Sequence, residues 1–175
     1  MDILITHEPG GTYLADKIRT LFLSEGAKNA SAETQFGLVW AARADHMANK
    51  IIPALKNGTS VLCDRFDSST YAYQVHAGCA PNLEKLFWKT RDGFLGKYKP
   101  DLYIFLDVDP KTGLERINRR GGAKTNFDSR NLAFHKEVSA GFIKFFKHVP
   151  HRVLDASRSF ERVAADFADL IKHVV

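Results

Sequence analysis

The residues best suited to chemistry lie between Asp64 and Gln74, where the sequence reads Asp-Arg-Phe-Asp-Ser-Ser-Thr-Tyr-Ala-Tyr-Gln. They follow the apolar run 60–63, which predicts a buried strand that ends in a charged pair and opens into a loop and a helix. In an open α/β sheet, ligands bind outside the carboxyl ends of the strands. An acidic and a guanidinium side chain at that place suit a metal-bound phosphate, and the hydroxyls, phenol and amide that follow suit the edge of a small polar ring.

The elements that must position these residues alternate between strands and helices. Apolar runs predict strands at 3–6, 60–63, 102–107 and 152–154. Helices are expected between them, at about 14–22, 32–56, 70–75 and 82–94, from 110 to a polar loop at 119–127, from that loop to about 148, and at 160–174. Strands separated by helices favour a mostly parallel sheet covered on both faces, and therefore an α/β fold.

Helical spacing also predicts which side chains form the core. The candidate core residues are Leu14, Ile18, Leu21 and Phe22 in the first helix, Phe36, Trp40, Met47, Ile51 and Leu55 in the long helix, and Phe142, Phe145 and Phe146 near the end. Pro53 is expected to bend the long helix or to mark its last turn.

Composition limits the class of protein. The chain has 175 residues, 45% of them hydrophobic and 26% charged, which is typical of one soluble globular domain spanning 1–175. The net charge of +5 fits either an anionic small substrate or nucleic acid. The two cysteines match no metal or disulfide pattern, which favours a reducing compartment. Without a long apolar run or a secretory signal, we expect a cytoplasmic protein with no membrane partner.

Five blocks of residues, in order, resemble the thymidylate kinase family, whose members transfer the γ-phosphate of ATP to dTMP. The blocks are 7–12 (His-Glu-Pro-Gly-Gly-Thr), 40–43 (Trp-Ala-Ala-Arg), 64–74, 100–110 (beginning Pro-Asp-Leu and ending Leu-Asp-Val-Asp-Pro) and 154–157 (Leu-Asp-Ala-Ser). The resemblance covers essentially the whole chain from Asp2 onward. It implies a three-layer sandwich like that of other P-loop kinases, a lid at about 116–130, a homodimer, no nucleic-acid partner, and ATP and Mg²⁺ as cofactors.

The resemblance also implies roles for particular residues. Those expected to bind dTMP are Glu8, Pro9, Gly10, Arg43, Arg65, Ser69, Thr70, Tyr73 and Gln74. Within that set, Glu8 is expected to face the sugar, Arg43 a thymine carbonyl, Thr70 the base edge and Tyr73 the place of a ribose 2′-hydroxyl. The expected catalytic residues are Asp64, Arg65, Arg119 and Arg120, with Asp64 also orienting a metal-bound water; Arg116, Asp155 and Ala156 are expected at the ATP.

The largest departure from the family is a missing phosphate loop. No G-x-x-x-x-G-K-[ST] motif occurs in the sequence, although that loop gives the ATP phosphates backbone N–H groups and a Lys. Met1 stands at what resembles the second strand of the fold, so the family's first strand, loop and helix are expected to be absent. We then expect the sheet to show a gap, a direct pairing of the strands ending at Asp64 and Asp107, or an edge borrowed from another molecule.

Three smaller departures concern the substrate. His7 stands where the family usually has Arg, and Val39 stands where a Phe usually stacks on the thymine. Residues 125–128 align with a lid motif that usually reads Asp-Arg-aromatic-Glu, so Asn126 replaces its arginine. Loss of the stacking ring is expected to cost about 1–3 kcal/mol of binding energy, by analogy with base–aromatic stacking elsewhere.

Each motif also has a plainer interpretation. Residues 8–11 are compatible with a simple tight turn, Asp64 and Arg65 with a self-contained ion pair, and Arg43 with a solvated helix residue. Ser69 and Thr70 are compatible with helix caps. The basic residues of the run 111–124, which are Lys111, Arg116, Arg119, Arg120 and Lys124, suit either a solvated face or a lid that closes over phosphates.

Three functions therefore remain open from the sequence. The first is a dTMP kinase that uses ATP and Mg²⁺, and the second is a catalytically dead remnant that keeps the dTMP site. The third is a basic nucleic-acid-binding protein, which is disfavoured because no known binding motif is present and the basic residues gather at the expected lid.

Overall fold

The strands form two separate parallel pairs. In the computed structural model, which describes residues 2–27, 29–121 and 125–172, β1 (Ile3–His7) pairs with β2 (Ser60–Asp64), and β3 (Tyr103–Asp107) pairs with β4 (His151–Asp155). Both pairings are parallel, which confirms the expected strand direction and places all four strands within two residues of their predicted bounds. Within the described residues, no ladder joins one pair to the other. Of the three outcomes expected for the sheet, the structure shows the gap.

Helical segments fill the connections between strands. They are α1 (Tyr13–Leu23), η1 (Glu25–Ala27), α2 (Ala32–His46), η2 (Met47–Ile51), α3 (Ile52–Lys56), α4 (Asp67–Thr70), η3 (Tyr71–His76), α5 (Asn82–Leu95), α6 (Pro110–Arg120), α7 (Leu132–Phe146) and α8 (Phe160–Lys172). The single long helix predicted over 32–56 is correct in extent, but a π-helical segment, η2, interrupts it before Pro53. A second π-helical segment, η3, follows α4 directly. Such segments are frequent at functional sites.

The two strand pairs are joined by an aromatic core and a buried polar network. Tyr71, Phe87 and Phe145 are fully buried at the centre of the core, and Phe145 and Phe146 confirm the predicted inner face of α7. Just after β2, the Asp67 carboxylate accepts hydrogen bonds from Arg91 Nε at 2.6 Å and from the Tyr103 hydroxyl at 2.6 Å. Since Tyr103 begins β3, this network makes β2 and β3 the inner strands of the two pairs.

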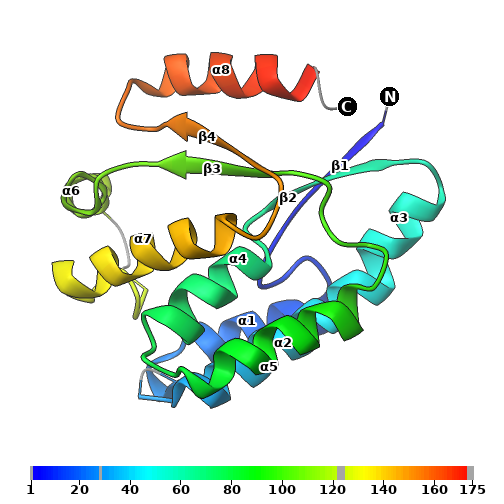
Figure 1. Cartoon of the computed structure of the whole chain (residues 1–175), viewed down its shortest axis with the longest axis horizontal. Helices are drawn as coiled ribbons and strands as arrows, with labels where there is room; N and C mark the ends of the chain where they lie inside the picture. Colours follow the sequence, from blue (N-terminus) through cyan, green and yellow to red (C-terminus); the bar gives the residue numbers. More distant parts are fainter. Residues whose placement is uncertain (1, 28, 122–124, 173–175) are drawn as a thin grey trace.

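The half of the molecule around β3 and β4 is much less covered than the sequence predicts. Figure 1 shows α7 on one face of this strand pair and α8 on the other. Even so, Leu106 is 49% exposed and Val153 is 54% exposed, and none of the described residues of α8 is buried. The strand predicted at 102–107 has an apolar run typical of a buried strand, yet only Tyr103 lies in the core.

Other predicted core residues are exposed as well. On α1, Leu14 and Leu21 are more than half exposed, and Ala15 and Phe22 provide the buried face. Leu55 is also exposed. Apolar spacing identified the amphipathic helices, but it does not reveal whether a partner lies against their apolar face.

None of the helices in the described part of the chain has both the length and the apolar character needed to cross a bilayer.

The unpaired edges generate a prediction about association. Exposed, unpaired strands are templates for pairing with other chains, so the 175-residue chain should self-associate as its concentration rises. Leu106→Lys places a charge on the inner strand β3 and should shift the chain toward monomer in sedimentation velocity experiments.

Leu21→Lys is the matched control, because Leu21 is 55% exposed, close to the 49% of Leu106, but lies on helix α1. A parent chain that sediments as a monomer at every concentration would contradict this prediction. So would an equal effect of both substitutions.

Candidate functional site

A buried ionic cluster joins the end of β1 to α2. Glu8 follows β1 directly, and Arg43 and His46 are three residues apart on α2, which places them on one face of the helix. One carboxylate oxygen of Glu8 accepts from Arg43 Nε at 2.8 Å, and the other lies 3.2 Å from His46 Nδ1. The exposed fractions of Glu8, Arg43 and His46 are 2%, 3% and 0%. The plainer interpretation of Arg43 as a solvated helix residue is therefore wrong.

The three nitrogens of the Arg43 guanidinium differ in their hydrogen bonding. Its Nη2 donates to the Thr70 hydroxyl at 3.0 Å, whereas its buried Nη1 has no hydrogen-bond partner among the described residues. The rings of Trp40 and Phe66 lie 4.4 Å and 5.2 Å from its central carbon. A buried donor without a partner is costly in a folded protein, so this nitrogen is available to an acceptor atom of a ligand or a water molecule.

The turn after β1 packs directly against this cluster. A Cβ at Gly11 would lie 2.5 Å from His46 Nε2 and 2.7 Å from Thr6 Oγ1, and its φ of +92° is itself a conformation that favours glycine. Lys50 Nζ donates to the Gly11 carbonyl at 3.0 Å, and Arg19 Nη1 donates to the Pro9 carbonyl at 2.7 Å. The segment 8–11 is thus a bend whose backbone is held by two basic side chains, and the described residues show no backbone hydrogen bond that closes it as a tight turn. Gly10 also has a positive φ, of +134°.

Arg65 stands at the carboxyl end of β2 in an unusual backbone conformation. It is exposed and has a φ of +65°, which is uncommon for a residue other than glycine and often marks a functional site. Its Nη1 lies 3.5 Å from the Ser69 hydroxyl, and its guanidinium lies 5.7 Å from the centre of the Tyr73 ring. Within the described residues it forms no ion pair with Asp64, so the self-contained pair is not what the structure shows.

Asp64 and Cys63 end β2 with different chemistry. The Asp64 carboxylate is exposed, and a single carboxylate combined with phosphate oxygens and water is the donor set that Mg²⁺ commonly takes. By contrast, burial raises the pKa of the Cys63 thiol, and the nearby Glu8 carboxylate adds to that rise. Cys63 therefore stays protonated and is not a nucleophile.

The remaining dTMP candidates lie on α4 and η3. Ser69 and Thr70 lie within α4, and Thr70, which precedes η3 at its N-cap position, makes no side-chain cap hydrogen bond within the described residues, so the structure does not support a capping role. Buried Gln74 donates from its amide nitrogen to the Gln35 amide oxygen at 3.3 Å. A hollow of about 210 Å³ lies beside Tyr73, and its other walls include Gln35, Phe127 and Arg130.

The residues expected at ATP also come together. Arg116 of α6 donates to the carbonyl of Ala156 at 2.6 Å and to that of Ser157 at 2.9 Å, while the Ala156 N–H donates to the Asp107 carbonyl at 2.7 Å. The Asp155 carboxylate accepts from the backbone N–H of Ser157 at 2.9 Å. This loop therefore lies at the carboxyl ends of β3 and β4 and is fixed by α6.

Within the expected lid, Asn126 is buried, whereas the two arginines that end α6 are exposed. Arg119 and Arg120 are exposed at the end of α6; Arg119 Nε lies 3.5 Å from its own helix at the Glu115 carbonyl, and Arg120 lies 4.0 Å from Asp128. Lys124 lies outside the described residues. Both interpretations of the basic run, a solvated face and a lid, therefore remain predictions.

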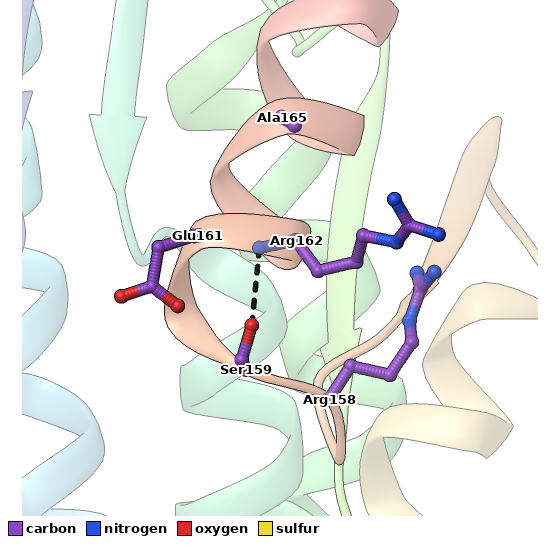
Figure 2. Close-up of a pocket in the computed structure, with 5 residues that line it drawn as sticks. All are labelled: Arg158, Ser159, Glu161, Arg162 and Ala165. Atoms are coloured by element: carbon purple, nitrogen blue, oxygen red, sulfur yellow. Dashed lines mark hydrogen bonds between the residues drawn. The ribbon is translucent and has the colours of Figure 1, made fainter.

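An open hollow of about 540 Å³ lies on the first turns of α8 (Figure 2). Figure 2 shows Arg158 and Arg162 pointing to the same side, with Ser159 Oγ accepting from the Arg162 N–H at 3.4 Å. Arg158 is already paired with the carboxylates of Asp155 and Asp166. Its charge is thereby compensated, and the hollow has no buried polar group that would select a ligand.

Sequence reasoning missed three residues of the site. His46, Arg19 and Lys50 hold Glu8, Pro9 and Gly11, yet none of them lies in a block that resembles the family. The only signal for His46 was its position three residues after Arg43, on the same helix face. The sugar contact expected of Glu8 stays a prediction, because the structure shows its carboxylate engaged by Arg43 and His46.

Comparison with known proteins gives a consistent result. A family model described as thymidylate kinase matches residues 1–167. A thymidylate kinase of Caulobacter vibrioides is 39% identical over 172 residues, covering 97% of this chain and 81% of that protein. Thymidylate kinases of Shouchella clausii and Pseudomonas putida strain GB-1 are each 38% identical over 178 residues; the alignments cover 99% and 100% of this chain, and 82% and 83% of those proteins.

The buried cluster generates a prediction about stability. Glu8→Ala would leave Arg43 as a buried charge without its counter-ion, which costs about 3–5 kcal/mol of the free energy of unfolding. Urea denaturation should show this loss, whereas Glu115→Ala, which removes an exposed carboxylate from α6, should change stability little. Equal stability of the two variants would show that the Glu8 cluster does not hold the site together.

Proposed function

The chain belongs to the thymidylate kinase family, a family of phosphotransferases, and we propose that its site binds dTMP as the acceptor of the γ-phosphate of ATP. The product of that transfer is dTDP. The proposal includes Mg²⁺ as the cation that accompanies the phosphates.

The single observation that carries the proposal is the free donor of Arg43. Its Nη1 is buried and has no hydrogen-bond partner in the described part of the chain, while Glu8 and Thr70 fix the other two nitrogens. A pyrimidine carbonyl at Nη1 would satisfy this donor, and the Thr70 hydroxyl beside it could serve the neighbouring polar atom of the base edge. Because an arginine only donates, this arrangement favours a carbonyl over an amino group at that position of the ring.

The phosphate of dTMP is assigned to Arg65. This guanidinium is exposed, stands at the carboxyl end of a parallel strand and lies beside the Tyr73 ring, which would cover the sugar. Arginine suits phosphate because its planar fork of donors stays charged. The Tyr73 phenol would then exclude a ribose 2′-hydroxyl, and Asp64 would hold a water molecule of the Mg²⁺ ion.

ATP is assigned to the loop 155–157 and to the arginines of α6. Arg116 and the Ala156 backbone hold this loop at the carboxyl ends of β3 and β4, and the exposed side chains of Arg119 and Arg120 would exchange their long contacts to Glu115 and Asp128 for phosphate oxygens. Phosphoryl transfer depends on positioning and on stabilising negative charge, so no acidic general base is needed.

The alternative is a protein that binds dTMP without transferring phosphate. The 175 residues contain no Gly-rich phosphate loop, and within the described residues β2 and β3 do not pair with each other. This alternative keeps every assignment to dTMP and abandons only the assignments to ATP.

An activity assay separates the two functions. The 175-residue chain should phosphorylate dTMP slowly or not at all, because no residue in it replaces the loop Lys, and turnover near about 10 s⁻¹, the median for enzymes, would contradict this. Fusing the family's N-terminal strand–loop–helix module to the chain should restore turnover if it is a kinase. Continued inactivity of a folded fusion that binds both nucleotides would favour the binding protein.

Calorimetry tests the acceptor site itself. Arg65→Ala should weaken dTMP binding by roughly tenfold or more, since hydrogen bonds to charged groups contribute about 1.5–3 kcal/mol. Arg43→Ala should chiefly reduce the preference for dTMP over dCMP, which carries an amino group in place of a carbonyl.

Arg162→Ala on α8 is the matched control, because it removes an exposed arginine far along the chain from these residues. Unchanged dTMP affinity in both Arg65→Ala and Arg43→Ala would remove the two arginines from the site.

A further inference from the structure

The ring of His46 is the most constrained part of the site that the proposed function leaves unused. It is fully buried, Nδ1 lies 3.2 Å from Glu8, and Nε2 lies 2.8 Å from the Thr6 hydroxyl. Thr6 is itself only 5% exposed. Both ring nitrogens are therefore engaged by groups of the β1 segment.

The chemistry of these partners fixes the hydrogen on the ring. A carboxylate paired with an arginine can only accept, so the hydrogen must be on Nδ1, directed at Glu8. The Thr6 hydroxyl can donate or accept and so satisfies Nε2 in either case. With one Glu8 oxygen held by His46, the other is aimed at Arg43 Nε, 2.8 Å away.

Two features of the chain favour histidine over an apolar residue at position 46. Gly11 leaves room for the ring, since a Cβ there would approach Nε2 to 2.5 Å. The helix also changes to π-helical geometry immediately after His46, at Met47. A leucine would fill similar space but would leave a Glu8 oxygen and the Thr6 hydroxyl without this partner, and buried polar groups are costly when unpaired.

We propose that His46 is a positioning residue for base recognition: it orients Glu8, and through Glu8 it directs the free nitrogen of Arg43 at the nucleobase carbonyl. This inference rests on the proposed function in one respect, namely that Arg43 contacts the base. His46 itself touches no substrate in this account.

The binding test uses two substitutions. His46→Leu removes both hydrogen bonds, and His46→Asn retains an amide nitrogen near the place of Nδ1. Calorimetry should show dTMP affinity falling in the order parent, His46→Asn, His46→Leu, with a loss of about tenfold in the last. The preference for dTMP over dCMP should fall in the same order.

A double-mutant cycle distinguishes positioning from packing. In an Arg43→Ala background, His46→Leu should cause no further loss of dTMP affinity, because the residue through which it acts is gone. Ile51→Ala, a buried substitution one helical segment away, is the control: it should lower the melting temperature without changing the dTMP to dCMP ratio. A full loss from His46→Leu in the Arg43→Ala background would overturn the proposal.

A measurement without ligand tests whether His46 orients Glu8, even if the chain does not bind dTMP. The Arg43 Nε–H, buried and bonded to Glu8, should give a slowly exchanging proton–nitrogen signal by NMR. His46→Leu should shift that signal and speed its exchange, with Ile51→Ala leaving it in place. An unchanged Arg43 signal in His46→Leu would show that His46 does not orient Glu8, whereas a changed signal without dTMP binding would refute only the assignment of Arg43 to the base.

Discussion

The structure of the site depends on burying one carboxylate, that of Glu8. An ionised carboxylate away from water must be paired and hydrogen-bonded, and here both partners come from α2. That requirement fixes α2 against the end of β1, confines the following turn to a residue without a side chain at Gly11, and sets the plane of the Arg43 guanidinium. Thr70 then takes a second nitrogen, which ties α4 to the same cluster. The nitrogen left over is the group that can recognise a ligand.

A different constraint acts on the strands. Parallel strands at the centre of an α/β fold are covered by neighbours on both edges and by helices on both faces. In the described residues no backbone pairing joins β2 to β3, and Asp67, just after β2, is instead hydrogen-bonded to Tyr103 at the start of β3. The aromatic core around Tyr71, Phe87 and Phe145 therefore holds the two halves together. Among the residues expected to bind dTMP, Arg43, Thr70 and Gln74 lie beside that core and are buried, whereas Arg65 is exposed, as are most residues of β4 and α8.

Much of this could be predicted from the sequence, for identifiable reasons. Apolar runs located all four strands, and their separation by helices predicted parallel pairing. Spacing and family resemblance together selected Arg43, Arg65, Thr70 and Tyr73 as candidates, because these residues stand in contiguous blocks, and the structure places Arg43 against Thr70 and Arg65 beside Tyr73. His46 and Arg19 were missed, since their roles arise only where chain segments far apart in sequence converge. The exposure of Leu14, Leu21 and Leu106 could not be predicted either. An apolar face is typical of a helix or strand that packs against another element, but the sequence does not show whether such an element covers it.

The central claim is that the unpaired nitrogen of Arg43 recognises a carbonyl of the nucleobase. A crystal structure of the chain with dTMP tests it most directly. The account predicts a thymine carbonyl oxygen about 2.7–3.2 Å from Arg43 Nη1, with the Glu8 and Thr70 contacts preserved. A bound dTMP whose base lies elsewhere, with Nη1 satisfied by water or by another part of the protein, would contradict it.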